Sequence, residues 1–277
     1  MSNRRVVLLS PGGTFADAVL ALLADRGVEI AAFLLYLPGG PGEWRKAPTA
    51  GRRLLSLAGT PLRWARRRVR QRAHARAARR KGPVVLTGRL NGARMERDLR
   101  RLAPDGVVLA HCGLVARNVL QVPRDGVVNV HPGLLPWIRG NSPIGNSLVR
   151  GVPLGATAFR VDPGIDTGAI LARRLVPVSG VETAGELREA VFRLWVGMTA
   201  DLAADACAGR VPPGSPQHAR FPLCGTLPAP EQIALIEDAV RRGEPKALFD
   251  RWAPACDPLD LSLPFDADAV LTARAAE

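Results

Sequence analysis

The sequence predicts an α/β fold built on a doubly wound, mostly parallel sheet. Short, continuously apolar runs such as Val6 to Leu9 recur in the first half of the chain, and strands covered on both faces have this character. Segments of helical length separate these runs, and breakers such as Ser10-Pro11-Gly12-Gly13 stand where a strand ends. Strands that alternate with helices in this way pair in parallel, with helices on both faces of the sheet.

The first half supplies five expected strands and two helices. The strands are expected at Val6 to Leu9, Val28 to Leu37, Val84 to Leu86, Gly106 to Ala110 and Gly126 to Val130. Thr14 is suited to cap a helix that runs to about Asp25, because its hydroxyl can accept a backbone N–H of the first turn. A second helix is expected from about Gly92 to Leu102.

After Val130 the pattern is less regular, because a Pro- and Gly-rich loop runs from His131 to Ser142. The elements expected beyond it are a helix around Ile144 to Arg150, an extended stretch from Gly155 to Val161, a strand from Ala169 to Val176, a long amphipathic helix from about Ala184 to Ala208 and a helix near Glu231 to Arg242. We therefore expect one main domain, 1–210, with a basic helical insertion at about 43–82. Residues 211–277 are expected to form a small C-terminal extension that packs on the core through Phe249, Trp252 and Phe265.

The positive charge of the chain is concentrated in one segment. The formal net charge is +13, from 38 Lys and Arg against 25 Asp and Glu. Of the basic residues, 14 lie between Trp44 and Lys81, where there is no Asp or Glu, and the rest of the chain is nearly neutral. Leucines and Trp64 are interleaved with these arginines. The segment is either a solvated helical insertion or a docking surface, 45–81, for a phospholipid membrane surface, an acidic carrier protein, a nucleotide-linked sugar or tRNA.

The cysteines and the start of the chain indicate a compartment. The four cysteines show no paired spacing and no C-x-x-C motif; they are Cys112, Cys207, Cys224 and Cys256. The first strand follows Met1 to Arg5 with no signal peptide before it, and the longest apolar stretch, Ile30 to Leu37, is too short to span a bilayer. A reducing cytoplasm is therefore the expected compartment. No group of residues has metal-ligand spacing, so no metal is expected.

The strongest candidate site lies at a strand end, in the segment Val127-Val128-Asn129-Val130-His131-Pro132-Gly133-Leu134-Leu135-Pro136. Side chains alternate along a strand, so Asn129 and His131 project from the same face, at the carboxyl end where open α/β sheets bind ligands. The amide can hold a developing oxyanion, and the imidazole can donate to it or shuttle a proton, which suits acyl transfer. Taken alone, an Asn-x-His pattern more often marks a turn amide and a structural histidine.

A second candidate site is the loop Val161-Asp162-Pro163-Gly164-Ile165-Asp166-Thr167-Gly168. Its two glycines allow a tight loop, and its carboxylates need a reason beyond turn propensity. Asp162 is equally well explained as an ordinary turn residue. Asp166 could reach His131, orient the ring and raise its pKa, or accept a proton from a substrate amine. The alternative for Asp166 is a plain loop carboxylate.

A weaker candidate site is the turn Ser10-Pro11-Gly12-Gly13-Thr14. Backbone N–H groups at this helix N-terminus could face a phosphate. The turn lacks the Gly-x-Gly-x-x-Gly pattern of dinucleotide-binding sites, which disfavours NAD. A purely structural turn explains it equally well.

Taken together, these motifs resemble those of the folate-dependent formyltransferases in order and spacing. The resemblance is carried by Asn129-Val-His131-Pro-Gly-Leu-Leu-Pro, Arg139-Gly140, Gly155-Ala-Thr157 and Asp162-Pro-Gly-Ile-Asp166-Thr-Gly168. It runs in layout from Val6 to roughly Arg210 and is dense only from Pro104 to Leu175. That family includes glycinamide ribonucleotide transformylase, methionyl-tRNA formyltransferase and the sugar N-formyltransferases, and the resemblance implies their Rossmann-like fold.

The resemblance also implies a site. Asn129, His131 and Asp166 would form a catalytic trio, with 10-formyltetrahydrofolate as the formyl donor. Asn129 and protonated His131 would stabilise the oxyanion of a tetrahedral intermediate, and Asp166 would help manage the protons. The folate would contact Cys112, Gly113, Leu114, Val115, Val161, Asp162 and Gly164. Besides the basic insertion, the acceptor pocket is expected from the region Trp137 to Asn146 and the turn, at Gly12, Gly13, Thr14, Arg139 and Asn141.

The acceptor we expect is the amine of a small molecule, an amino sugar or a specialised metabolite. The resemblance to methionyl-tRNA formyltransferase implies a sizeable C-terminal β domain that grips tRNA. The residues after Val211 look more like the short extensions of sugar and small-molecule formyltransferases, which disfavours a nucleic-acid partner. Methionyl-tRNA formylation and formyltetrahydrofolate hydrolysis remain alternatives. A non-enzyme alternative is a module that binds anionic surfaces through 45–81.

Overall fold

The computed structural model describes residues 4–37, 69, 72, 75, 76, 78, 79, 81–217 and 221–253. The chain divides into two compact units. The first comprises the described residues up to Asn129, together with Arg160–Pro163 and Val196–Val211, and the second comprises Val130–Phe159, Gly164–Trp195 and the described residues from Pro212 onward. The expected organisation, one main domain 1–210 with an extension at 211–277, stays a prediction.

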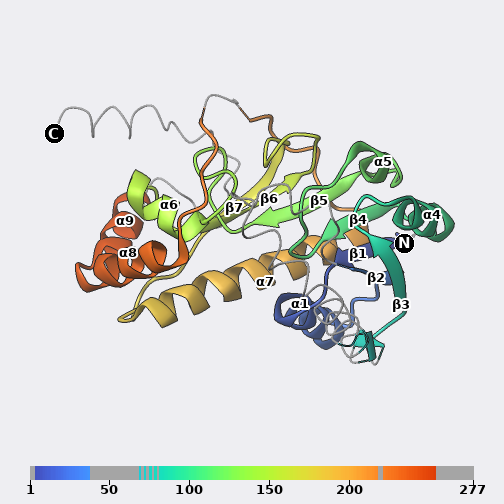
Figure 1. Ribbon diagram of the computed structural model, residues 1–277, viewed down its shortest axis with the longest axis horizontal. Coiled ribbons are helices and arrows are strands. Elements are labelled where there is room, and N and C mark those ends of the chain that lie inside the picture. Colours follow the sequence, from blue (N-terminus) through green and yellow to red (C-terminus); the bar gives the residue numbers. More distant parts are fainter. Residues whose placement is uncertain are drawn as a thin grey trace, which may run out of the picture. The chain divides into compact units, whose positions relative to one another are not determined.

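The predicted sheet is present (Figure 1). The described strands form one seven-stranded sheet in the order β3-β2-β1-β4-β5-β6-β7. Its first five strands in chain order are β1 Val6–Ser10, β2 Ala32–Leu37, β3 Val84–Arg89, β4 Gly106–Leu109 and β5 Val127–His131. The pairs β1–β2, β1–β4, β2–β3 and β4–β5 are parallel. β6 (Gly155–Arg160) and β7 (Ile170–Leu175) pair antiparallel, so the sheet is mixed and mostly parallel, as predicted.

Helices cover both faces of the parallel strands in the first unit. α4 (Ala93–Leu102) buries Met95 and Leu99 in a cluster with alternate side chains of β1, β2 and β4, and the single turn α5 (Arg117–Leu120) adds Val119. α1 (Thr14–Asp25) lies on the other side of these strands (Figure 1). It buries a separate apolar stripe, made of Phe15, Ala16, Val19, Leu20 and Leu23. The strands are apolar on both faces because both faces are covered.

The second strand is shorter than predicted. β2 begins at Ala32, whereas the apolar pattern predicts a strand from Val28. Gly27 takes a left-handed backbone with φ 64°, and the amides of Gly27 and Val28 donate to the carbonyls of Ala24 and Leu23 at 3.0 and 2.9 Å. This is a Schellman arrangement, which uses Val28 to close the C-terminus of α1.

Four helical segments pack together in the second unit: α6 (Pro143–Arg150), the part of α7 (Ala184–Ala208) up to Trp195, α8 (Ala229–Arg241) and α9 (Glu244–Trp252). One apolar cluster joins them through Leu148, Leu187, Ile236 and Leu248, with Phe249 packed against it. Trp252 belongs to a separate cluster with Trp137. The predicted contacts of Phe249 and Trp252 with the core are therefore present, while Phe265 lies outside the described residues.

Two helices are not among the predicted elements. α5 is four residues long, too short to show a helical period. α9 has Pro245 in its first turn, where proline is tolerated because that N–H has no intrahelical acceptor. In the sequence the same proline looks like a helix breaker.

Part of the basic insertion is described, and it is helical. Val69, Arg72, Ala75, Arg76 and Ala78 have helical backbone. Ala75 and Ala78 are buried, whereas the other three side chains are exposed. The remainder of 43–82 lies outside the described residues, so a docking role for this segment stays a prediction.

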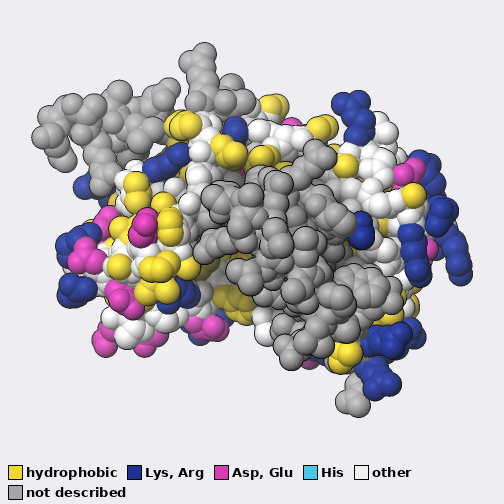
Figure 2. Space-filling view, viewed as in Figure 1, with side chains coloured by type: hydrophobic (Ala, Val, Ile, Leu, Met, Phe, Trp, Pro, Cys, Tyr) yellow, Lys and Arg dark blue, Asp and Glu magenta, His cyan; other side chains and the backbone are white. Residues whose placement is uncertain are grey.

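Figure 2 shows Lys and Arg side chains gathered along α4. The exposed members there are Arg94, Arg97, Arg100 and Arg101. Two of them are paired within the helix, Arg94 with Asp98 at 3.7 Å and Arg100 with Glu96 at 2.9 Å. Exposed pairs of this kind contribute about 0.5 kcal/mol or less, so this surface stays solvated.

Neither a membrane span nor a metal cluster occurs in the described part of the chain. No helix there combines the length and the apolar content that a bilayer crossing needs. No three His, Cys, Asp or Glu side chains of the described residues come together as a set of metal ligands. Cys112, Cys207 and Cys224 are free thiols, and Cys256 lies outside the described residues.

Candidate active site

The candidate site starts at the carboxyl end of β5. Val127 and Val128 are buried and pair with Val107 and Val108 of β4. Asn129 is half-buried and His131 is 6 % exposed. Because side chains alternate along a strand, these two polar groups leave β5 on the same side.

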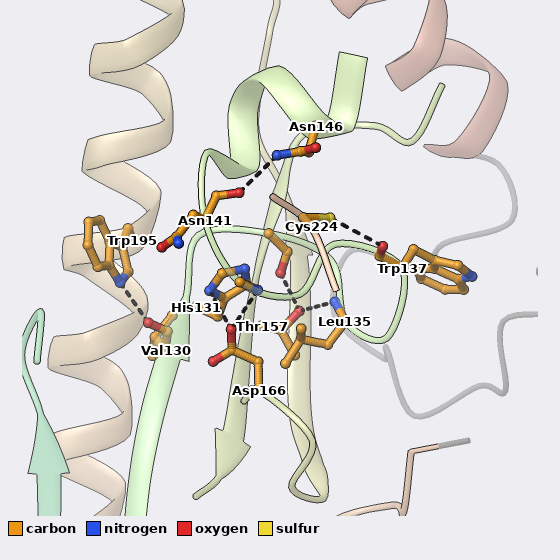
Figure 3. A network of polar contacts seen from close by, with 12 residues as sticks. Val130, His131, Leu135, Trp137, Asn141, Asn146, Thr157, Asp166, Trp195 and Cys224 are labelled. Carbon is orange, nitrogen blue, oxygen red and sulfur yellow. Dashed lines mark hydrogen bonds and ion pairs between the residues drawn. The ribbon is translucent and has the colours of Figure 1, made fainter. Parts of the chain in front are cut away.

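Within the second unit, the structure brings His131 and Asp166 together (Figure 3). Nδ1 of His131 lies 3.6 Å from Oδ2 of Asp166, which is longer than an ordinary hydrogen bond. The Asp166 oxygen also accepts a hydrogen bond from the backbone N–H of Gly140 at 2.8 Å. The Asp166 backbone is left-handed, with φ 51°, which Asp tolerates better than most residues. The Asp166 carboxylate therefore contacts both the ring of His131 and the backbone of Gly140.

Burial lowers the pKa of His131 below its ordinary value of 6.5. The carboxylate of Asp166 and the backbone of Ile138 act in the opposite direction, but burial is the largest effect. Asp166 therefore raises the pKa of His131 as expected, but burial outweighs this effect. The ring is neutral in the free protein at pH 7.

Nε2 of His131 is buried without a hydrogen-bond partner among the described residues. With the carboxylate on the Nδ1 side, Nε2 is the nitrogen available to a substrate.

Acidification is expected to destabilise the fold through His131. The folded protein binds a proton at this ring less readily than the unfolded chain, because burial depresses the folded-state pKa. The stabilising contribution of the neutral ring is complete above the unfolded pKa of about 6.5 and is lost as pH falls below it. We expect His131→Gln to make the free energy of unfolding, measured with urea, fall less steeply between about pH 7 and 5. Parallel pH dependences of the wild type and the variant would contradict a buried, neutral His131.

A buried hydroxyl fixes the loop that follows His131. Thr157 on β6 is fully buried, and its Oγ1 accepts from the Leu135 N–H at 3.0 Å and donates to the Gly133 carbonyl at 2.8 Å. Gly133 has no room for a side chain, since an added Cβ would lie 2.8 Å from Nε2 of His131. Thr157 stands in the quoted Gly155-Ala-Thr157 motif, but no role is predicted for it from sequence, because its partners are backbone groups.

Thr157→Val keeps the side-chain shape and removes both hydrogen bonds. We expect it to lower the free energy of unfolding by about 1–3 kcal/mol, because the N–H of Leu135 and the carbonyl of Gly133 would remain buried and unpaired. Urea unfolding measures this, with Thr226→Val as the matched control at an exposed hydroxyl. Equal losses in the two variants would show that the buried hydroxyl has no special role.

The residues expected to contact folate lie in both units, and they are described separately. In the first unit, Cys112 donates from Sγ to the Leu9 carbonyl at 3.0 Å, and burial raises the pKa of its thiol to about 12. Val115 and Val161 pack in the same apolar cluster as Cys112. Leu114 is 64 % exposed. A buried wall with one exposed apolar side chain is compatible with a ring ligand, and the folate role stays a prediction.

The other predicted folate contacts are loop residues. Gly113 donates its N–H to the Tyr36 hydroxyl at 3.4 Å in the first unit, where Asp162 also lies. Gly164 belongs to the second unit, and an added Cβ there would overlap the Thr167 hydroxyl. Glycine at 164 is therefore required by close packing within the loop, whatever it contacts.

The turn before α1 differs from its predicted geometry. Thr14 is the first helical residue, and Gly13, with φ 106°, occupies the N-cap with no side-chain cap bond. The N–H of Gly12 donates to the Ser10 hydroxyl at 3.0 Å. That donor is therefore used inside the turn, and an anion site would depend on the amides of Gly13 and Thr14.

The two predicted acceptor residues on the other loop have different environments. Arg139 is half-buried, and its Nε has no partner among the described residues. Asn141 is exposed, and its Nδ2 donates to the Thr226 hydroxyl at 2.9 Å. Trp137, in the region predicted to line the acceptor pocket, is 3 % exposed and belongs to an apolar cluster instead.

The described fold is an α/β fold with a mostly parallel sheet, and within the second unit a loop carboxylate lies against a buried imidazole, an arrangement suited to proton transfer. The chain belongs to the Formyl transferase family, which it matches over residues 4–194. Members of this family use 10-formyltetrahydrofolate as the formyl donor.

Curated relatives agree with this family, and a solved structure shares the fold. The chain is 41 % identical over 140 residues to a methionyl-tRNA formyltransferase of Halorhodospira halophila, covering 50 % of this chain and 45 % of the relative. It is 30 % identical over 262 residues to the methionyl-tRNA formyltransferase of Roseiflexus castenholzii, covering 93 % and 74 %. The phosphoribosylglycinamide formyltransferase structure from Anaplasma phagocytophilum has the same fold, with a TM-score of 0.55, 18 % identity and coverage of 82 % and 100 %. The match to the Halorhodospira protein thus spans less than half of that relative's length.

Proposed function

We propose that this chain moves the formyl group of 10-formyltetrahydrofolate to a primary amine, using Asn129, His131 and Asp166. The observation that carries the proposal is the approach of Asp166 to within 3.6 Å of the buried His131, in a chain of this family. A contact this close between residues 35 positions apart requires the loop that carries Asp166 to fold back toward His131. That geometry matches the roles that the motifs suggest.

The reaction requires one bond to form, one to break and one proton to move. The amine nitrogen bonds to the formyl carbon, the bond from that carbon to N10 of the folate breaks, and a proton passes from the amine nitrogen to N10. Nε2 of neutral His131 accepts this proton and returns it, while Asp166 stabilises the imidazolium in between. The Asn129 amide donates to the formyl oxygen as negative charge develops there. A ring that is neutral in the free protein can accept this proton, whereas the protonated ring that the resemblance implies at the oxyanion cannot.

The first candidate acceptor is the α-amine of methionyl-tRNA. The two curated relatives named above are methionyl-tRNA formyltransferases, at 41 % and 30 % identity. An Arg-rich segment such as 45–81 would supply the positive charge that a tRNA backbone needs. The similarity to these relatives favours methionyl-tRNA over the small-molecule amine that the sequence analysis expects.

A small-molecule amine, such as that of an amino sugar, is the second candidate. The described residues after Val211 form helices α8 and α9, whereas the resemblance implies a β domain for gripping tRNA. These helices pack on α6 and α7 through Ile236 and Leu248. In the described part of the chain, these two helices therefore favour a small-molecule acceptor over a tRNA.

The test incubates the full chain with 10-formyltetrahydrofolate and, in parallel, methionyl-tRNA, a nucleotide-linked amino sugar or no amine. Tetrahydrofolate release and product mass are followed. Formylmethionyl-tRNA would support the first candidate, and a formamido sugar the second. Tetrahydrofolate release without an amine would indicate hydrolysis. No turnover with any of them, together with salt-sensitive binding to anionic vesicles or nucleic acid, would instead favour a binding module.

A further inference from the structure

The polypeptide after α7 returns to the two loops that carry Asp166 and Gly140. We call residues 215–217 and 221–227 the C-terminal strap; all its contacts described below lie within the second unit. Ser215 exchanges backbone hydrogen bonds with Ile170 at 2.8 Å, just beyond the Asp166 loop. Further along, Cys224 pairs with Gly140 in a β-bridge, and its N–H donates to the Arg139 carbonyl at 2.8 Å. The strap thus touches both backbone segments that hold the catalytic carboxylate.

Gln217 makes the most specific of these contacts. Its Nε2 donates to the Asp166 carbonyl at 3.1 Å and to the Gly168 carbonyl at 2.6 Å. Two carbonyls can only accept, so the nitrogen of the amide must face them and the orientation of the side chain is settled by chemistry. One side chain therefore ties together the two ends of the turn Asp166-Thr167-Gly168, from 51 residues away.

The other end of the strap supports the second contact of Asp166. Gly140, whose N–H donates to Oδ2 of Asp166, has φ 93°, and an added Cβ would lie 2.9 Å from the Cys224 carbonyl. The Asn141 N–H approaches the same carbonyl at 3.4 Å. Gln217 therefore fixes the backbone of Asp166, and Cys224 fixes the amide that binds its carboxylate.

We propose that Gln217 is a positioning residue, which holds the Asp166 loop so that the carboxylate stays against His131. The inference rests on the proposed function for its effect on rate, but its geometric part does not. Gln217 lies beyond residues 4–194, the stretch that matches the family. A part of the chain outside that match thus completes the catalytic arrangement.

The oxygen of the Gln217 amide supports a positioning role over a purely stabilising one. Oε1 is buried without a hydrogen-bond partner among the described residues. A buried carbonyl oxygen without a donor is unfavourable, so it offsets part of what the two donated hydrogen bonds contribute to stability. Unsatisfied or strained groups of this kind are typical of functional sites.

The test compares Gln217→Met, which keeps the length of the side chain and removes its donors, with Gln121→Met as a matched control at an exposed glutamine of the first unit. Two readouts are needed, the pKa of His131 from imidazole NMR and the kinetics of formyl transfer. Asp166→Asn calibrates the first, because the carboxylate raises the pKa of His131 and its removal should lower it. The unfolding midpoint of each variant is recorded alongside.

In Gln217→Met we expect the His131 pKa to fall in the same direction as in Asp166→Asn, and kcat to fall about 10- to 100-fold with KM changed far less, because small displacements of a catalytic group cost this much. The control should match the wild type in both readouts. An unchanged His131 pKa together with unchanged kcat would overturn the proposal, and so would a loss of activity matched by the fraction of protein unfolded. If the pKa shifts but the wild type transfers no formyl group, the positioning role stands and the proposed function fails.

Discussion

Replacing His131 by Ala is expected to lower kcat for formyl transfer by about 10²–10⁴-fold, the range that a positioned proton-transfer group supplies. The ring is buried, lies 3.6 Å from Asp166 and leaves Nε2 without a partner among the described residues, and the proposed mechanism assigns the proton transfer to this nitrogen. Asn129→Ala should cost about 10²–10³-fold, as for the loss of one oxyanion donor. Tetrahydrofolate release at saturating donor and acceptor measures both.

The two substitutions should not be additive. In the proposed mechanism Asn129 and His131 act on the same transition state, so the double variant should lose little more than the worse single variant. Asn118→Ala is the matched control, because its side-chain amide binds Asn91 and Glu96 in the first unit and no catalytic role is assigned to it. Turnover of the double variant at the wild-type rate would remove the basis for the catalytic assignment.

The largest effect on stability is expected from Trp137→Ala, about 3–5 kcal/mol in the free energy of unfolding. Trp137 is 3 % exposed, and its ring packs edge-to-face on Trp252 at 5.6 Å and on Phe221 at 6.3 Å between centroids. The Arg173 guanidinium lies 5.1 Å from the ring centroid, and its Nε donates to the Leu135 carbonyl at 2.8 Å. The substitution would leave a cavity and remove both edge-to-face contacts and the cation–π contact.

Urea unfolding of Trp137→Ala and of Trp137→Phe separates these effects. The Phe variant keeps a ring and most of the buried area, so it should lose well under half as much as the Ala variant. Because Trp252 is in α9 and Phe221 is in the strap, Trp137→Ala should also expose the C-terminal residues to proteolysis first. A loss below about 1 kcal/mol for the Ala variant would show that Trp137 is not the anchor of this cluster.

Most of the strands could be predicted because each is a short apolar run with breakers at its ends. β1, β4 and β5 match their predicted positions to within one residue, and α7 matches its predicted bounds. The predicted bounds were wrong where specific backbone hydrogen bonds, rather than apolar periodicity, set the end of an element. The start of β2 is set by the Schellman turn at Gly27, which apolar periodicity does not reveal.

In the candidate site, too, some residues could be predicted from the sequence and others could not. Asn129, His131 and Asp166 could be proposed from motif order, and the structure places the last two together in the second unit. Thr157, Gly140 and Gln217 received no role, because each acts through backbone groups or on backbone groups, and such contacts leave no residue pattern. Trp137 lies at the start of the region predicted to line the acceptor pocket, Trp137 to Asn146, and it is instead a core residue.

The sequence by itself determined the fold class, the family and the chemical groups, because strand period, breaker placement and motif order are local properties of the chain. Only the tertiary structure decided that His131 is neutral and that Asp166 is held from two sides. Both facts depend on which distant segments exclude water from the ring and which carbonyls face Gln217. Burial and hydrogen-bond partners belong to the folded packing, so the pKa of a histidine cannot be read from its neighbours in sequence.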